Sequence, residues 1–223
     1  MSNKKQQTQQ EQHVGTAVTG VEAFLQKYQK HILNAILAIL VIIVAIFAIN
    51  RWYLSPQKAE AKAQMYTAER LFRANDFETA LNGDGNIMGF AQIIDKYGKK
   101  GGSSVYMYAG ISALQLGKNE EAVSYLKKYS GKDEILKARA LCCMGDAYAN
   151  LGETQKSFDT YKKAAAVAEN SYAAQYLMKA AIMAEELGKN DEALKLYKDI
   201  QIKYPQSYEG YEVNKYISRI ENK

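Results

Sequence analysis

Three similar blocks, each built around a glycine, recur in the C-terminal half of the chain. The blocks read LGKNEEA, LGETQKS and LGKNDEA, and their glycines, Gly117, Gly152 and Gly188, are 35 and 36 residues apart. A period of this length is typical of antiparallel helix pairs that stack into a solenoid. Since one pair cannot bury both of its apolar faces, neighbouring pairs must stack to form a core. The spacing therefore predicts an all-α solenoid, in which each glycine ends a helix as a left-handed C-cap.

Small and aromatic residues recur at fixed places around these glycines. The first block contributes Tyr106, Ala109, Gly110, Ala113, Ala122 and Leu126. The second contributes Leu141, Met144, Gly145, Tyr148, Ser157, Tyr161 and Ala164. The third contributes Leu177, Ala180, Ala181, Ala184, Ala193, Tyr197 and Pro205. Over residues 103–206 the chain resembles three tetratricopeptide repeats, although it lacks the family's tryptophan, has serine for one alanine, and has the proline in one block only.

The segments on either side extend the predicted solenoid. Over residues 51–102 we expect a linker helix (57–73), an irregular stretch from residue 80 through 86, and a helix over 87–97, which together form a divergent first repeat. Residues 207–223 are predicted to form a capping helix with one polar face. The predicted fold is therefore all-α: a single N-terminal transmembrane helix, then a tetratricopeptide-type α-solenoid of about four helix hairpins with a C-terminal capping helix.

The predicted transmembrane helix rests on one apolar run. Residues 32–49, ILNAILAILVIIVAIFAI, carry no charge and one polar side chain, that of Asn34. Eighteen helical residues extend about 27 Å, close to the hydrocarbon thickness of a bilayer. Basic and aromatic residues that suit headgroup level flank the run, namely Lys27, Tyr28, Lys30, His31, Arg51, Trp52 and Tyr53. We therefore predict a membrane-proximal and transmembrane helix over residues 21–50, with the span over about 32–50.

Two alternatives to a membrane anchor are disfavoured. A core helix of a soluble protein would have a polar face, which this run lacks. A cleaved signal peptide would have a shorter apolar core, a shorter preceding region and a small-residue cleavage site. Charge does not decide the orientation, because Lys27 and Lys30 precede the run while Arg51 and Lys58 follow it. Residues 1–20, rich in Gln, Lys and Thr, are expected to form a disordered polar tail.

The sequence offers little for catalysis or metal binding. Cys142 and Cys143 are adjacent, and neighbouring helical residues point about 100° apart, so we interpret both as buried apolar residues. The two histidines, His13 and His31, do not complete a zinc ligand set. The nucleophile elbow, the phosphate-binding loop and the HExxH motif do not occur. We predict no enzymatic activity, no cofactor and, from a mild and evenly spread net charge of +5, no nucleic-acid partner.

The resemblance to tetratricopeptide repeats also implies a binding groove. In that family certain positions of each first helix line the concave side. Carried over by register, these positions are Met107, Ile111, Leu114, Arg139, Asp146, Asn150, Gln175, Met178, Ile182 and Glu186. Packing against the next repeat is an equally open interpretation of the apolar members. The subfamily that clamps C-terminal acidic peptides needs Lys and Asn where this chain has Met107 and Ile111, which argues against such a clamp.

The layout of the whole chain resembles the YfgM-like family of membrane-anchored tetratricopeptide proteins. That resemblance implies a single-pass protein of the bacterial inner membrane, with the repeat domain in the periplasm. It also implies protein partners near the protein-export channel, whether channel subunits, chaperones or nascent chains, while residues 32–50 contact the lipid bilayer. The alternative is a structural scaffold that self-associates within a membrane-bound assembly.

Overall fold

The described part of the chain is built from helices. The structure, a computed structural model, describes residues 24, 27–167, 170 and 172–222. Within these residues every regular element is a helix, which confirms the all-α prediction. The chain divides into two compact units, Met1–Pro56 and Gln57–Lys223. The tail predicted over residues 1–20 lies outside the described residues.

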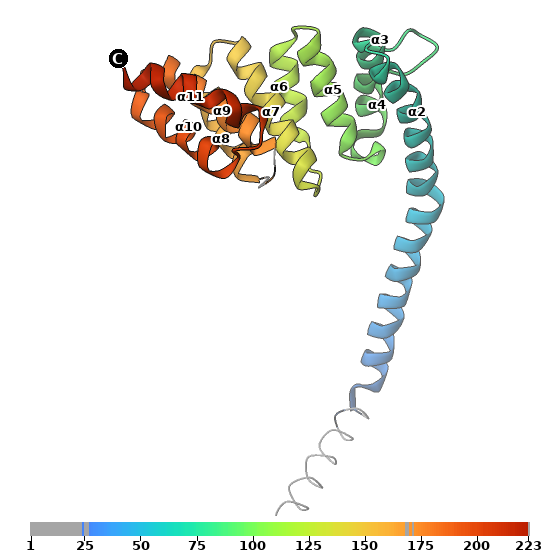
Figure 1. The fold of residues 1–223 in the computed structure, drawn as a ribbon. Helices are drawn as coiled ribbons and strands as arrows, with labels where there is room; N and C mark the ends of the chain where they lie inside the picture. The colour runs from blue at the N-terminus through green and yellow to red at the C-terminus, as the bar shows by residue number, and fades with distance from the viewer. Residues whose placement is uncertain (1–23, 25–26, 168–169, 171, 223) are drawn as a thin grey trace, which may run out of the picture. The chain divides into compact units, whose positions relative to one another are not determined.

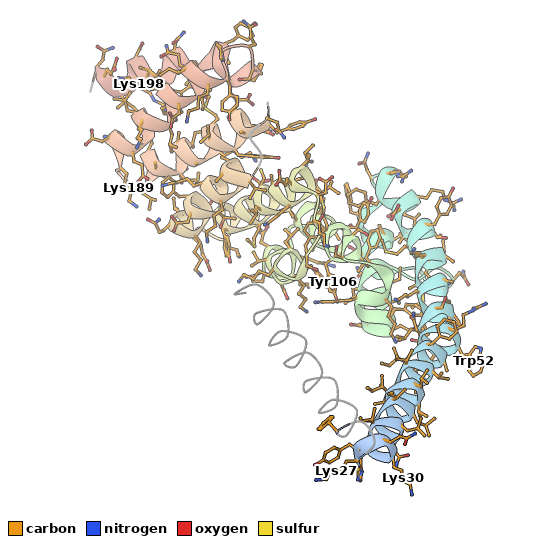
Figure 2. All side chains as sticks on the ribbon, turned by 90° about the horizontal axis from the view of Figure 1, so that it is seen from below. Lys27, Lys30, Trp52, Tyr106, Lys189 and Lys198 are labelled. Atoms are coloured by element: carbon orange, nitrogen blue, oxygen red, sulfur yellow. The ribbon has the colours of Figure 1, made fainter. Side chains whose placement is uncertain are left out.

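One long helix carries the apolar run. It extends over Lys27–Arg73 and contains an 18-residue window of mean hydropathy 3.2, none of which is buried. Phe47, for example, is 69% exposed. Lys27 and Lys30 lie at one end of the apolar run and Trp52 lies at the other (Figure 2). The helix is therefore long and apolar enough to cross a membrane, and no residue of the apolar window is buried by the described part of the chain.

A π-helical turn follows the apolar run. This turn, η1 (Ile49–Leu54), leads directly into α2 (Ser55–Arg73), and the Ser55 N–H bonds to the carbonyl of Asn50, five residues earlier. Pro56 comes next in the chain. In a regular α-helix a proline ring clashes with the carbonyl four residues before it, which here belongs to Trp52. We attribute the wider π turn to the relief of this clash.

The second unit is a series of helix pairs (Figure 1). The first hairpin joins α2 to two short helices, α3 (Phe77–Asn82) and α4 (Phe90–Tyr97), and the 3-10 helix η2 (Gly98–Gly101) follows. The other pairs are α5 (Ser104–Gln115) with α6 (Asn119–Lys128), α7 (Glu134–Asn150) with α8 (Thr154–Val167), and α9 (Tyr172–Glu186) with α10 (Asn190–Lys203). Finally, α11 (Tyr208–Glu221) packs against α9 and α10. Four hairpins and a capping helix agree with the predicted solenoid.

The three glycines of the repeat end α5, α7 and α9 in the same way. Gly117, Gly152 and Gly188 have φ angles of 72°, 72° and 71°. The N–H of each following residue bonds to the carbonyl five residues earlier: Lys118 to Ala113 at 2.8 Å, Glu153 to Tyr148 at 2.9 Å and Lys189 to Ala184 at 2.9 Å. These bonds satisfy carbonyls that a helix end otherwise leaves free. The predicted left-handed C-caps are confirmed.

Two glycines let the paired helices approach closely. A Cβ atom built on Gly110 would lie 2.5 Å from Leu126 Cγ, and one built on Gly145 would lie 2.5 Å from the ring of Tyr161. Opposite Gly145, the buried Ser157 hydroxyl donates a hydrogen bond to the glycine carbonyl at 2.9 Å. Because this bond satisfies the hydroxyl, serine replaces the family's alanine without leaving a buried polar group unpaired.

The first hairpin differs from the expected pattern. The place of its second helix is taken by two short helices, α3 and α4. Residues 77–82 form α3, although an irregular stretch was expected from residue 80. The Asp76 carboxylate accepts a hydrogen bond from the Thr79 N–H at 3.2 Å and caps α3. The Asp84 carboxylate accepts one from the Ile87 N–H at 2.8 Å, which closes a turn where α4 was expected to begin. As a result, α4 starts later, at Phe90.

Candidate protein-binding surface

Half of the predicted groove residues are used in packing between hairpins. Met107, Ile111 and Leu114 of α5 are partly buried, and they pack against a small cluster formed by Leu126, Ala140 and Cys143. In the C-terminal half, Met178 is buried and Ile182 is partly buried within the cluster shared by α7 to α11. These five apolar side chains therefore contribute to the stacking of one hairpin on the next.

The other predicted groove residues are polar. Arg139, Asn150, Gln175 and Glu186 are exposed, whereas Asp146 is half-buried. Asn150 donates a hydrogen bond from Nδ2 to Asn119 Oδ1 at 3.1 Å, across the second and third hairpins. The fully exposed positions of the predicted groove are therefore polar, while its apolar positions are partly or fully buried.

Asp146 belongs to a network that holds successive hairpins together. Its carboxylate accepts a hydrogen bond from Tyr161 Oη at 2.7 Å and pairs with Lys179 Nζ, so it links α7, α8 and α9. Glu185 has the same role one hairpin further on. It accepts from Tyr197 Oη at 2.7 Å and pairs with Arg219 Nη2 at 2.6 Å, which links α9, α10 and α11. Two carboxylates therefore fix the relative positions of three consecutive first helices.

The pKa values in this network follow from burial and from the carboxylates. Burial, and then the hydrogen bond to Asp146, raise the pKa of the Tyr161 hydroxyl. Burial and the bond to Glu185 do the same to the pKa of Tyr197. Burial alone would lower the pKa of Lys179, but its hydrogen bond to Asp146 and the nearby thiols outweigh that effect and raise it. Both tyrosines are thus neutral donors and Lys179 is a cation at neutral pH.

A strip of exposed side chains crosses the first turns of α7, α9 and α11. Leu136, Tyr172 and Tyr208 lie 36 residues apart and are 44%, 54% and 76% exposed. Three residues further along each helix is a second exposed residue, so that the strip also contains Arg139, Gln175 and Tyr211. Residues three apart are neighbours on a helix surface. We call these six residues the first-turn strip.

Helix caps hold the first-turn strip in place. The Asp133 carboxylate accepts a hydrogen bond from the Leu136 N–H at 2.9 Å. The Asn170 side chain accepts from the Tyr172 N–H at 2.9 Å, and the Ser207 hydroxyl accepts from the Gly210 N–H at 3.0 Å. Such caps satisfy N–H groups that have no partner within the helix and keep the first turn from fraying. The three exposed pairs are therefore presented from fixed helix ends.

Only Arg139 and Gln175 of the strip were predicted from the sequence. Leu136, Tyr172, Tyr208 and Tyr211 precede or follow the repeat motif, and none belongs to the family's pattern of small and large positions. Their common spacing of 36 residues is visible in the sequence and was the signal that could have found them. The spacing alone does not show exposure, since Tyr161 and Tyr197 share the same interval and are buried.

A groove of about 430 Å³ lies between α8 and α10. Ala165, Ala166, Leu177 and Leu196 supply much of its lining, together with Lys162 and Lys203. Both lysines already have partners: Lys162 pairs with Glu192 at 2.7 Å and Lys203 pairs with Asp199 at 3.4 Å. The groove therefore suits an apolar side chain better than a charged group.

The two cysteines are buried and are not bonded to each other. Burial, and then the nearby Asp146, raise the pKa of the Cys142 thiol to about 12, and burial also raises the pKa of Cys143. A thiol with so high a pKa is protonated at neutral pH and is a poor nucleophile. Among the described residues, moreover, no three His, Cys, Asp or Glu side chains are grouped as a metal site.

Comparison with known proteins supports the same architecture. A tetratricopeptide repeat model matches residues 175–207, which lie mainly in α9 and α10. A crystal structure of MamA protein is similar, with a TM-score of 0.54 and 19% sequence identity, over 74% of this chain and 90% of that chain. A second crystal structure of MamA gives a TM-score of 0.50 and 18% identity, over 70% and 92% of the two chains. No curated protein matches significantly in sequence. The chain thus has a solenoid fold with a tetratricopeptide repeat, and the likeness to MamA concerns the fold.

Proposed function

We propose that this protein is a non-catalytic, membrane-tethered protein–protein interaction module. The first-turn strip is the observation that carries the proposal. It places exposed apolar or amphipathic side chains at equivalent positions of three alternate helices, α7, α9 and α11. Exposed patches of this kind mark interaction sites, and tyrosine is enriched among the residues that dominate binding energy.

The geometry of the strip suits a partner segment that crosses the helices. The three pairs lie on α7, α9 and α11, in that order along the solenoid, and so form a ladder that one extended partner segment would cross. The ion pairs of Asp146 and Glu185 fix the ladder before a partner binds, which lowers the entropy cost of binding.

The setting of this module follows from the layout of the chain. The apolar helix would anchor the protein in the bacterial inner membrane as a single-pass protein, and the repeat domain would lie in the periplasm. There it would act as an adaptor near the protein-export channel, with channel subunits, chaperones or nascent chains as partners. The support for this setting is the architectural resemblance to YfgM-like proteins together with the apolar Lys27–Arg73 helix.

Site-specific photocrosslinking in intact cells tests the adaptor role. A photoreactive amino acid would replace Tyr172 or Tyr208 in the full chain. Asp159, an exposed residue of α8 outside the strip, provides the matched control position. We expect export-channel subunits or chaperones to be crosslinked from Tyr172 and Tyr208 and to be absent, or much weaker, at Asp159.

Other products would change the conclusion. If the strip positions crosslink only a second copy of the protein, a self-associating scaffold replaces the adaptor. If Asp159 gives the same products as Tyr172, the strip has no special role. A C-terminal alkaline phosphatase fusion tests the topology separately, because that enzyme is active only after export. An inactive fusion would place the repeats in the cytoplasm.

A further inference from the structure

The exposed side of α2 carries cations at regular intervals. Lys58, Lys62, Tyr66 and Arg70 follow one another at four-residue spacing, which places them on one side of the helix. All four are exposed, and the Tyr66 side chain is 70% exposed. We call these four residues the cationic face.

Another side of α2 packs in the solenoid. Ala61, Met65 and Ala68 are buried in the cluster that α2 shares with the first and second hairpins. Among the described residues, Lys58, Lys62 and Arg70 form no ion pair, although Glu69 of the same helix pairs with Arg73 at 3.4 Å.

The other end of the solenoid has a different charge pattern. There α11 carries charges of both signs, which sum to −1: Glu209, Glu212, Lys215, Arg219 and Glu221. A terminal helix needs a polar outer surface to stay soluble, and mixed charges meet that need. The cationic face is polar as well, and although Glu69 lies on the same side of α2, that acid pairs with Arg73, so Lys58, Lys62 and Arg70 leave this side with a net charge of +3. Solubility alone does not require such an excess of positive charge.

We propose that the cationic face binds the anionic lipid headgroups of the membrane that holds the apolar run. This inference rests on the proposed membrane tether. Lys58 follows the apolar run by nine residues, so the face begins close to where the chain would leave the bilayer. Lysine and arginine next to a membrane helix are attracted to anionic lipids, and tyrosine is favoured at headgroup level. Charge complementarity therefore selects a lipid surface as the occupant.

Contact along the whole face sets a geometric condition. Lys58 and Arg70 are 12 residues apart, which is about 18 Å along a helix, whereas a headgroup layer is only about 5–8 Å thick. The whole face therefore reaches headgroups only if α2 follows the bilayer surface. The π turn η1 and Pro56 lie between the apolar run and the cationic face, and both features are established causes of helix bending.

Fluorescence of the reconstituted full chain tests the proposal. An environment-sensitive dye would be attached after Ala63→Cys, an exposed position between Lys62 and Tyr66, since both native cysteines are buried. In vesicles that contain phosphatidylglycerol we expect blue-shifted emission and strong quenching by a headgroup spin label. Neutral phosphatidylcholine vesicles, or about 0.5 M salt, should remove both effects because salt screens the attraction.

Charge-reversal variants distinguish lipid binding by the cationic face from attraction due to the net charge of the whole protein. Lys58→Glu, Lys62→Glu and Arg70→Glu together should reduce the quenching to its value in neutral vesicles. The single change Lys62→Gln should weaken the association about fivefold. The control combines Lys128→Glu, Lys163→Glu and Lys195→Glu, three exposed lysines of α6, α8 and α10 with the same change in net charge. It should leave the dye signal unchanged.

Two outcomes would overturn the proposal. One is equal quenching in neutral and anionic vesicles, and the other is an equal effect of the two triple variants. Extraction of the reconstituted chain at alkaline pH provides a separate readout of the tether. A chain that resists extraction but shows no lipid-dependent signal contradicts the lipid-binding face alone, whereas a chain that is extracted contradicts the tether itself.

Discussion

The first and third hairpins each contain a glycine with no room for a side chain, Gly89 and Gly145. Backbone atoms fill the space at Gly89, and a side chain fills it at Gly145. In the third hairpin a Cβ on Gly145 would lie 2.5 Å from the Tyr161 ring. In the first hairpin a Cβ on Gly89, at the start of α4, would lie 2.4 Å from the backbone oxygen of Leu81 in α3. A side chain has other rotamers, whereas a backbone carbonyl moves only with the chain around it. The regular hairpin is therefore set by side-chain packing, and the divergent hairpin by its backbone turns.

The largest effect is expected from Gly145→Leu. A leucine would overlap the Tyr161 ring and force α7 and α8 apart. The free energy of unfolding should therefore fall by more than about 3 kcal/mol, and Tm by roughly 10 °C. Thermal unfolding of the full chain in mild detergent, followed by circular dichroism, measures the change. Lys163→Leu introduces the same residue at an exposed position of α8 and should change Tm little. An unchanged Tm for Gly145→Leu would show that the repeat register assigned to α7 and α8 is wrong.

A smaller but more local effect is expected from Gly89→Ala. The methyl group would meet backbone atoms of residues 81 and 83, so the loop must shift at a cost of about 2 kcal/mol. Hydrogen exchange should increase in α3 and α4 more than in α7 to α10, since each hairpin contacts only its neighbours. Gly85→Ala is the matched control: its φ is +90°, but no atom lies within 4 Å of the added Cβ. Equal losses for the two variants would show that conformational strain, and not close packing, governs this loop.

The hydrogen bonds to Asp146 and Glu185 predict losses of unfolding free energy between those of Gly89→Ala and of the helix-end glycine variants. Tyr161→Phe removes a hydrogen bond to a carboxylate and should cost about 1–2 kcal/mol. Tyr197→Phe removes the equivalent bond to Glu185 and should cost a similar amount. Denaturant unfolding measures both, and a double-mutant cycle with Lys179→Met isolates the part that the Asp146 ion pair contributes. If the tyrosine and lysine changes are additive, the network does not act as a unit.

Residues with a role inside one helix pair were predictable from the sequence. The repeat register identified Gly145 and Tyr161 as a small and a large position of the same block, and the structure shows that they face each other across the helix pair. The same register places Gly117, Gly152 and Gly188 at helix ends, where a positive φ angle favours glycine. The fold class followed from these positions together with the apolar run.

Residues with a role between hairpins were not predictable in the same way. For Met107 and Ile111 the sequence left groove lining and packing against the next repeat equally open, because the register does not fix how closely neighbouring first helices approach. In the structure both are partly buried and pack against a cluster that includes Ala140 and Cys143 of the next hairpin. The partner of Glu185, Arg219, is 34 residues away and lies outside the repeat motif. The exposure of Tyr172 and Tyr208 depends on the same inter-hairpin geometry, which one sequence without its three-dimensional packing does not contain.

The smallest effects are expected at the turns that the three regular hairpins share. Gly117→Ala, Gly152→Ala and Gly188→Ala each force a side chain into the left-handed region, which should cost about 1 kcal/mol. No atom lies within 4 Å of a Cβ at any of the three, so strain is the only cost and the losses should agree within about 0.5 kcal/mol. Denaturant unfolding of the full chain measures them against Gly145→Leu. Unequal losses of unfolding free energy at these turns would show that the second, third and fourth hairpins differ from one another in backbone conformation. The first hairpin would then differ from the other three only in degree.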